Sequence, residues 1–424
     1  MNDYLDNAGI LLDNGKIEEA IALVKDILRK EPKNPRALHI LAGCHKTLFR
    51  HDDAISIWQE LVKVSPDFHS AWYNMGNTLR EIGRLSESKI ALEKACSLED
   101  NPDYYCNLGI VAHELKDSAL ALSSLRHALH LQPSHVEANF ALAIHHLNQK
   151  EWTPGFARYE WRKFRADSSC LDIPWPLWNG SVLNEKKILI HAEQGFGDVI
   201  HFARFIPEVL TRCKHVSLLC HPELKELMIN SFPEITFYPF WGELPITDFQ
   251  APLLSLPFIL KLKEFPQTFP YLKAFPLELA KGKKIGICWQ GNNRFKENSK
   301  RSVGFNWFKP LLELSNTQIF SLQYGFPSPD PRIICPDIRN FQDTANLMSS
   351  LDLVITVDTS VANLAGALGI PGYVLVPFAN DWRWGTNENN SFWYPSLRLI
   401  RAEATGWGEI DLAISPHSFT PPNT

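Results

Sequence analysis

Asp358, Thr359 and Ser360 form a short polar turn whose residue types suit the binding of an anion. Serine or threonine can cap the first turn of a helix, and the free N–H groups and positive dipole end beyond the cap attract a phosphate. Residues 351–357 are an apolar run typical of a buried parallel strand, and residues 361–368 carry an apolar face at helical spacing. Followed by a strand at 373–378, the turn is predicted to belong to a phosphate-binding βαβ unit at the carboxyl edge of a sheet.

A second turn, EQGFGD at residues 193–198, ends in a carboxylate that could act as a base. It lies between a predicted strand at 187–192 and a helical pattern at 199–210. Gly195 and Gly197, next to Gln194, allow the backbone to bend sharply and to approach a ligand closely. Asp198 at the start of the helix has two interpretations, a plain N-cap or a functional carboxylate at the carboxyl end of a strand.

Basic and amide side chains follow two further predicted strands, at 284–289 and 319–323. The second of these strands ends at Gln323. The first leads into the polar loop 290–302, which contains Gln290, Arg294, Lys296, Lys300 and Arg301. Cations at a strand end could clamp a diphosphate, or the loop could simply be solvated. Asp381 and Arg383, beyond the strand at 373–378, could line a cleft or pack the crossover that follows.

The first part of the chain repeats with the period of the tetratricopeptide repeat. Ala20, Ala54, Ser88 and Ala121 are spaced 34, 34 and 33 residues apart. Gly76 and Gly109 are small where paired helices must approach closely, so these positions are expected to be scaffold. A solenoid of this kind offers a concave surface to an extended peptide or a partner domain. Asn74 and Asn77 could bond such a peptide, or they could lie on an ordinary exposed helix face.

A chain of 424 residues is too long for one hydrophobic core. We expect a repeat array at 1–165, a Pro- and Trp-rich linker at 166–180, and two α/β halves at 181–275 and 276–424. The linker's tryptophans suggest that it packs against a neighbouring domain. The first half is expected to end with a strand at 251–256.

Composition and charge limit the possible partners and compartments. The net charge of -5, without a sustained basic block, argues against a nucleic-acid partner. The eight cysteines lack CxxC spacing, which favours a reducing compartment without disulfides or structural zinc. The N-terminal residues lack the signal-peptide pattern, and no apolar run approaches the roughly 18 residues of a membrane span. These features predict a cytoplasmic protein.

Six segments, in this order, resemble motifs of bacterial tetratricopeptide-repeat proteins with a glycosyltransferase-family-9-like, heptosyltransferase-like domain. They are AEQGFGDVIHFARFIP, PLLSLPFIL, FPYLKA, RSVGFNWFKPLL, FSLQYG and LDLVITVDTSVANLAGALGIPGYVLVPFANDWRW. The likeness covers residues 150–405 and, with the repeats, nearly the whole chain. It implies an all-α repeat solenoid followed by an α/β GT-B fold, in which two Rossmann-like domains face each other. Residues 181–275 would then form the acceptor side and residues 276–424 the donor side.

The resemblance also implies roles for individual residues. Asp198 matches the family's general base, residues 358–360 resemble its Asp-Thr-Gly segment, and Arg301 matches a basic donor-phosphate position. The implied donor-binding residues are Arg301, Gln323, Asp358, Thr359, Ser360 and Asn363. The implied cleft-lining residues are Gln194, Gly195, Gly197, Gln290, Lys296, Asp381 and Arg383. The implied reaction is inverting and metal-independent, with a nucleotide-diphosphate sugar as substrate and no cofactor.

Two residues of the resembling segment depart from the family pattern, Asn363 in place of a histidine and Ser360 in place of a glycine. An asparagine can donate a hydrogen bond, but it cannot carry a proton at neutral pH. Two functions therefore stay open. One is a glycosyltransferase whose repeats recruit a protein, peptide or glycan acceptor, and the other is a catalytically degenerate scaffold or interaction module. A dinucleotide site fits less well because residue 200, where the third glycine would stand, is isoleucine.

Overall fold

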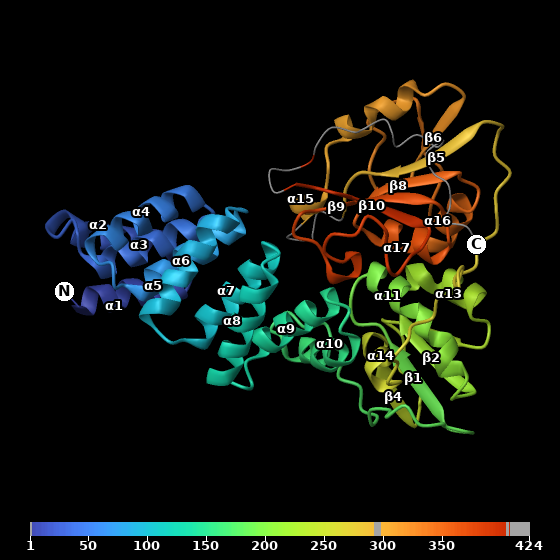
Figure 1. The fold of residues 1–424 in the computed structure, drawn as a ribbon, viewed down its shortest axis with the longest axis horizontal. Helices are drawn as coiled ribbons and strands as arrows, with labels where there is room; N and C mark the ends of the chain where they lie inside the picture. Colours follow the sequence, from blue (N-terminus) through green and yellow to red (C-terminus); the bar gives the residue numbers. More distant parts are fainter. Residues whose placement is uncertain (1, 292–297, 404–406, 408–424) are drawn as a thin grey trace. The chain divides into compact units, whose positions relative to one another are not determined.

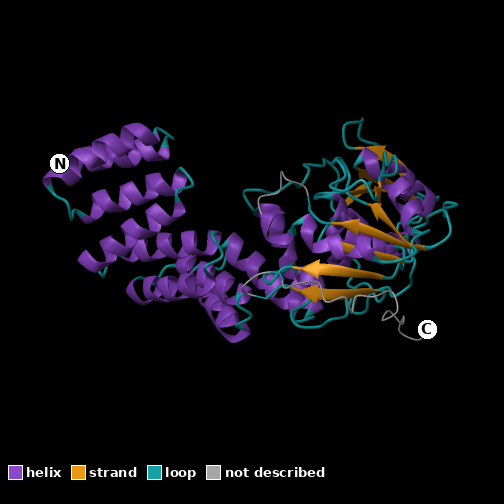
Figure 2. Cartoon of the chain, turned by 90° about the horizontal axis from the view of Figure 1, so that it is seen from above, coloured by secondary structure: helices purple, strands orange, loops and turns teal. Residues whose placement is uncertain are grey.

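The computed structural model describes residues 2–291, 298–403 and 407, and it divides into two compact units. The first unit is Met1–His145 and the second is His146–Thr424. The first is all helical and the second contains every strand of the described residues (Figures 1 and 2). The predicted fold class, a helical solenoid followed by an α/β part, is confirmed.

Successive helices of the first unit pack as hairpins (Figure 1). They are α1 (Asn2–Asp13), α2 (Ile17–Lys30), α3 (Pro35–Thr47), α4 (His51–Val64), α5 (His69–Glu81), α6 (Leu85–Leu98), α7 (Pro102–Glu114) and α8 (Ser118–Leu131), followed by α9 (Val136–Asn148), within which the unit ends. The small residues predicted at the helix contacts are confirmed. A Cβ at Gly76 would lie 2.7 Å from Leu92 Cγ, and one at Gly109 would lie 2.6 Å from Leu125 Cγ.

The second unit begins with α10 (Trp152–Tyr159) and the 3-10 helix η1 (Glu160–Phe164). These residues, which we expected to close the repeat array, belong instead to the α/β unit. The reason is a buried ion cluster, in which Arg162 donates to Glu193 beyond strand β1 at 2.7 Å and to Ser255 at 2.8 Å. In the segment predicted as a linker, Trp178 is 1% exposed, and its backbone N–H donates to Gln250 O of β4 at 2.8 Å.

The N-terminal half of the second unit has a four-stranded sheet in the order β3-β2-β1-β4, with all pairs parallel. Its strands are β1 (Lys187–His191), β2 (His215–Cys220), β3 (Thr236–Pro239) and β4 (Phe249–Pro252). Its helices are α11 (Phe196–Phe202), η2 (Ala203–Phe205), α12 (Ile206–Leu210), η3 (Pro222–Leu224), α13 (Lys225–Ser231), η4 (Leu253–Ser255) and α14 (Leu256–Ile259).

Two sequence predictions in this half were wrong in detail, and proline accounts for both. The single helix expected at 199–210 is broken into α11, η2 and α12, with Pro207 in the first turn of α12. The strand expected at 251–256 ends at Pro252, and the chain then turns helical, with Pro257 in the first turn of α14. Proline lacks the N–H that a continuing helix or ladder needs, but it fits the first turn of a helix.

The C-terminal half has a six-stranded, all-parallel sheet in the order β10-β9-β8-β5-β6-β7. Its strands are β5 (Lys283–Cys288), β6 (Thr317–Ser321), β7 (Ile333–Ile334), β8 (Leu353–Val357), β9 (Gly372–Val376) and β10 (Leu397–Arg401). Its helices are α15 (Asn298–Arg301), η5 (Phe305–Glu313), α16 (Phe341–Met348), α17 (Ser360–Ala367) and η6 (Trp382–Trp384).

Both sheets follow the doubly wound order of nucleotide-binding folds. Counted within its own half, the first sheet reads 3-2-1-4 and the second reads 3-2-1-4-5-6. The order reverses between β1 and β4 in one half and between β5 and β8 in the other. Ligands of open α/β sheets bind beyond the carboxyl ends of the strands at such reversal points. The turns after β1, β5 and β8 are therefore candidate ligand-binding turns.

The two halves are held together by α11 against α17 and by α13 against α16 (Figure 1). Beside the first contact, Arg204 of the N-terminal half is 2% exposed and lies 5.1 Å from the Trp393 ring and 4.8 Å from the Tyr394 ring of the C-terminal half. Its Nη1 donates to Trp393 O at 3.1 Å. Cation–π contacts with a buried guanidinium are strong because water does not screen them. The ends of β1 and β8 are thereby fixed close to each other.

Candidate active site

The turn after β8 caps the helix that follows it. Thr359 is the N-cap of α17, and its side-chain oxygen accepts a hydrogen bond from Val361 N at 3.3 Å. The apolar residues of 361–368 are buried, as the pattern predicts, which fixes the helix against the sheet. Asp358 and Ser360 stay partly exposed on either side of the cap. The turn thus presents polar groups and the positive end of α17 at the carboxyl edge.

The glycine turn after β1 lies directly against this second turn. A Cβ at Gly197 would be 3.0 Å from Asn363 Nδ2 and 3.6 Å from Ser360 Cα, so the glycine backbone lies in close contact with the start of α17. Gly195 is exposed and precedes α11, and Gln194 O accepts a hydrogen bond from His221 Nε2 at 2.9 Å. The structure therefore brings together two turns that are about 160 residues apart in the sequence.

Arg383 connects carboxylates from both halves. Its Nη2 donates to Asp198 Oδ1 at 2.5 Å, and its Nη1 donates to both Asp381 oxygens at 2.9 Å. Asp381 also caps η6 by accepting from Arg383 N. Although burial alone lowers the pKa of the Arg383 guanidinium, Asp381 and Asp198 raise it, so it stays charged. Asp381 and Arg383, which the sequence predicted either to line a cleft or to pack the crossover, thus form a hydrogen-bonded chain with the predicted base Asp198, in which Arg383 bonds both aspartates.

The two aspartates of the turns have perturbed acidities. Burial raises the pKa of Asp198, and the negative charges of Asp381 and Glu193 act in the same direction, against Arg383. Burial likewise raises the pKa of Asp358 to about 6, with Asp381 adding to the rise and Arg301 and Arg383 opposing it. Carboxylates whose acidity is shifted toward neutrality at a strand edge are typical of sites that exchange protons.

Asn363 faces into the protein and is 6% exposed. Its Nδ2 donates to Thr359 O at 3.2 Å, and its Oδ1 accepts from the Tyr394 hydroxyl at 2.8 Å. The same hydroxyl lies 2.9 Å from His201 Nδ1 of α11. Both polar groups of the Asn363 side chain are therefore used in a buried network that supports the Thr359 cap from behind.

The amide and basic residues after β5 and β6 form the next part of the edge. Gln323 Oε1 accepts from Trp289 N at 3.3 Å and from Gln290 N at 3.1 Å, which fixes the start of the polar loop. A Cβ at Gly291 would lie 2.7 Å from Arg301 Nη2, so the Arg301 guanidinium rests on this glycine. Its charge lowers the pKa of Asp358, against the larger effect of burial. Lys296, and Arg294 with it, lie outside the described residues.

A cavity of about 350 Å³ opens beyond the ends of β6 and β7. Its lining includes Ser321, Gln323, Tyr324, Phe326 and Asp337. An aromatic ring with hydroxyl, amide and carboxylate groups is a combination that can hold a flat ring bearing a polyhydroxylated sugar.

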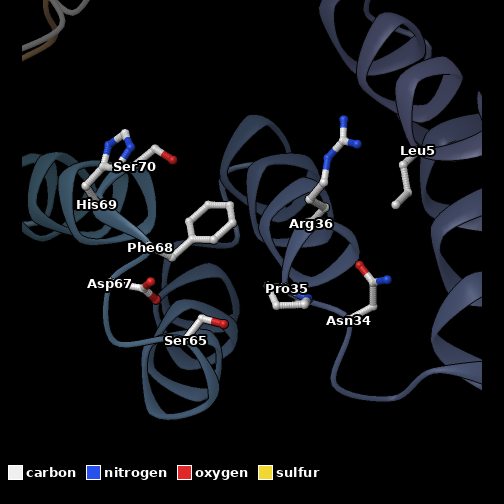
Figure 3. A pocket seen from close by; sticks show the side chains of 9 residues that line it. All are labelled: Leu5, Asn34, Pro35, Arg36, Ser65, Asp67, Phe68, His69 and Ser70. Carbon is white, nitrogen blue, oxygen red and sulfur yellow. The ribbon is translucent and has the colours of Figure 1, made fainter. Parts of the chain in front are cut away.

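The first unit has a cavity of its own, about 490 Å³ in volume, at the turns that precede α3 and α5 (Figure 3). Arg36, Phe68 and His69 line it, with Leu5 of α1 on one side. Arg36 is paired with Asp6 at 2.6 Å, and His69 Nδ1 lies 2.8 Å from the Tyr104 hydroxyl. Asn74, which the sequence singled out, lies 3.4 Å from His39 Nε2 in the neighbouring hairpin.

Sequence reasoning missed Tyr394, His201 and Glu193, all of which are buried around the two turns. Glu193 is held by Arg162 and by the Cys170 thiol, which donates to it at 2.7 Å. The position of Glu193 at the start of the EQGFGD turn could have marked it as a site residue. Tyr394 offered none, because its partners lie 31 and 193 residues away in the chain.

Neither a membrane span nor a metal cluster is found among the described residues. No helix among them is long and apolar enough to cross a lipid bilayer. Within the same residues, no group of three or more histidine, cysteine, aspartate or glutamate side chains is arranged to hold a metal ion.

Comparison with known proteins identifies the first unit. A sequence model of the tetratricopeptide repeat matches residues 11–75, and a second one matches residues 69–102 and 102–135. The first unit is a tetratricopeptide-repeat array. Such repeats bind proteins or peptides, so an interaction role follows for this unit.

Relatives extend the likeness beyond the array. Protein FlbA of Caulobacter vibrioides is 25% identical over 428 residues, which cover 88% of this chain and 71% of FlbA. That coverage must reach into the α/β unit. Protein O-mannosyl-transferase TMTC3 of Homo sapiens is 34% identical over 97 residues, or 22% of this chain and 11% of that protein. Among solved structures, Pseudomonas aeruginosa PilF is 21% identical, with a TM-score of 0.36 over 38% of this chain and 73% of PilF.

Proposed function

We propose that this protein is a glycosyltransferase that moves a sugar from a nucleotide-diphosphate sugar to a protein, peptide or glycan acceptor. The tetratricopeptide-repeat array would recruit the acceptor, and the α/β unit would carry out the transfer. The match to TMTC3 is compatible with a link to glycosylation, but it covers too little of either protein to carry the proposal. The support comes from the two turns and from the motifs they contain.

One observation carries the proposal. Asp198 and the Asp358–Ser360 turn stand at the strand-order reversals of two facing sheets, and Gly197 brings the two turns into direct contact. A base on one half and an anion-binding turn on the other are what transfer from a diphosphate to a hydroxyl requires.

In the proposed reaction, Asp198 takes the proton of the acceptor hydroxyl. The acceptor oxygen forms a bond to the anomeric carbon of the sugar while the bond from that carbon to the phosphate oxygen breaks. The electron pair of the broken bond leaves with the nucleoside diphosphate. The sugar carbon inverts because the nucleophile attacks opposite the leaving group.

The leaving diphosphate needs positive charge and N–H donors. The capped N-terminus of α17 and the Arg301 guanidinium would supply them, with Ser360 as a further donor. The nucleoside would occupy the cavity beyond β6 and β7, where Gln323 and Asp337 can bond ribose hydroxyls. No cofactor enters this scheme, and the nucleotide sugar is a substrate.

The deciding experiment is a donor screen. Titration calorimetry of the purified full chain against UDP, ADP, GDP and dTDP sugars should show heat for at least one of them. Asp198→Asn should keep that binding within about threefold and lose at least about a hundredfold in transfer rate, the usual scale of a general base. Asp167→Asn, a 72% exposed carboxylate of the same unit, is the matched control and should retain full activity.

A catalytically degenerate scaffold is the second candidate. It is favoured by Asn363, which stands where the resembling family has a histidine and whose amide bonds Thr359 O and the Tyr394 hydroxyl within the protein. A wild-type protein that binds a nucleotide sugar but neither transfers nor hydrolyses it would favour the scaffold. Absence of binding to every nucleotide sugar would remove the enzyme interpretation and leave only a scaffold that does not use nucleotide sugars.

A further inference from the structure

Arg383 is a residue of the C-terminal half that bonds the proposed base in the N-terminal half. It follows β9 in the C-terminal half, whereas Asp198 belongs to α11 of the N-terminal half. The guanidinium donates one hydrogen bond to Asp198 and two to Asp381. Asp381 also accepts a hydrogen bond from the backbone N–H of Arg383 at 2.9 Å.

The surroundings of Arg383 favour one fixed position. Its side chain is 10% exposed and lies 4.8 Å from the Trp382 ring and 5.6 Å from the Phe202 ring of the N-terminal half. A stacked, planar guanidinium loses little further freedom when it forms directed hydrogen bonds. Arg383 bonds only one oxygen of Asp198, and no hydrogen bond among the described residues ends on Oδ2. With the side chain 22% exposed, Oδ2 is the oxygen left for an acceptor proton.

We propose that Arg383 is a positioning residue that holds Asp198 across the boundary between the two halves, with Oδ1 bound and Oδ2 directed to the acceptor. This inference rests on the proposed transferase function. Its effect on catalysis would be to keep Asp198 ionised and oriented, without contact to the donor. A purely structural ion pair would hold the halves together, but the pH dependence of the reaction would then not follow the pKa of Asp198.

The charges that face Asp198 determine the sign of the expected pH effect. Asp381 and Glu193 disfavour its ionised form, while Arg383 and Arg162 favour it, and the charge of Asp198 in turn raises the pKa of Tyr159 of α10. Removing Arg383 therefore raises the pKa of the carboxyl further. The base would then be protonated over a wider range, and activity would be lost mainly at the acid side of the pH profile.

The test uses the full-length protein and three variants. Arg383→Gln removes the positive charge, and Arg383→Lys keeps it but lacks the paired N–H donors of the guanidinium. Asn230→Ala is the control, because it removes a different hydrogen bond between the halves, from Asn230 to Gln342 at 3.0 Å. The Asp198 carboxyl is titrated by ¹³C NMR, with its signal assigned by its loss in Asp198→Asn. Arg383→Gln should raise its pKa by about 1–3 pH units, the usual effect of losing an opposite charge at contact distance, and Arg383→Lys should raise it less.

The kinetic profile supplies the second measurement. In Arg383→Gln the acid limb of kcat should move to higher pH by the same amount, while the KM for the donor changes less than about twofold and Asn230→Ala matches the wild type. An unchanged Asp198 titration in a folded Arg383→Gln protein would overturn the role of Arg383. A wild-type protein that binds no nucleotide sugar would instead refute the transferase function, so the two failures are distinguishable.

Discussion

The substitution Arg162→Met tests whether the buried ion cluster attaches α10 and η1 to the α/β unit. Arg162 and Glu193 are 2% and 1% exposed, and their charged atoms are 2.7 Å apart. Methionine keeps much of the apolar volume but removes the charge, so Glu193 is left with the Cys170 thiol as its partner. Glu160 loses less, because Lys163 still pairs with it.

The expected cost follows from the isolation of Glu193. Leaving one member of a buried ion pair uncompensated costs about 3–5 kcal/mol of unfolding free energy. For a unit of this size, about 2 °C of melting temperature accompanies each kcal/mol, so we expect a loss of roughly 6–10 °C. Urea unfolding followed by tryptophan fluorescence is a suitable assay. Of the thirteen tryptophans, only Trp58 and Trp72 belong to the first unit, so the signal reports mainly on the second.

A second substitution separates charge isolation from lost packing. Adding Glu193→Gln to Arg162→Met removes the unpaired charge, so the double variant should be more stable than Arg162→Met alone. Lys214→Met is the control, because its pair with Glu185 is 73% and 77% exposed and solvent screening leaves it little effect on stability. If Arg162→Met costs no more than this control, or if the double variant is the least stable, the cluster does not attach these helices.

Two further predictions concern the turn after β8 and the repeat array. Burial raises the pKa of Asp358 to about 6 from its ordinary 3.8. The folded state therefore binds more protons than the unfolded state between about pH 4 and 6. Because of this difference, the contribution of Asp358 to the free energy of unfolding falls as the pH rises through that window. Asp358→Asn should therefore raise the melting temperature at pH 7.5 more than at pH 4.5, and equal effects would contradict the raised pKa. In the array, Gly109→Ala places a Cβ 2.6 Å from Leu125 Cγ and should cost about 1–3 kcal/mol, measured by helical circular dichroism. Gly9→Ala, with nothing within 4 Å, should instead gain about 0.5–1 kcal/mol, and the same sign for both would refute the close helix contact.

The parts of the fold that the sequence predicted are those coded by neighbouring residues. Each repeat hairpin carries its own helical spacing and its own small residue, so Gly76 and Gly109 were identified without reference to distant parts of the chain. The turn at 358–360 was equally local, since strand, cap and helix follow one another directly. Asp198 could be singled out for the same reason, as a carboxylate that follows a strand and a glycine turn.

The parts that were missed depend on contacts between distant residues. Two hydrogen bonds of Arg162, to residues 31 and 93 positions away, decide that α10 belongs with the α/β unit. The two-residue strand β7 exists only because β6 lies beside it. Arg383 could be named as a cleft residue, but its bond to Asp198 spans 185 residues and depends on how two helices pack. Periodicity carries no information on such pairings.

The sequence pattern singled out Asn363, but only the structure shows which groups its side chain contacts. As the position where the resembling family has a histidine, it was expected to contact the donor. In the structure its amide bonds Thr359 O on one side and the Tyr394 hydroxyl on the other. It thus bears on the proposed anion-binding turn through the backbone that carries the Thr359 cap. Because Tyr394 also contacts His201 of α11, the same network links this cap to the helix that carries Asp198. A change at Asn363 would therefore alter both turns at once through their shared support.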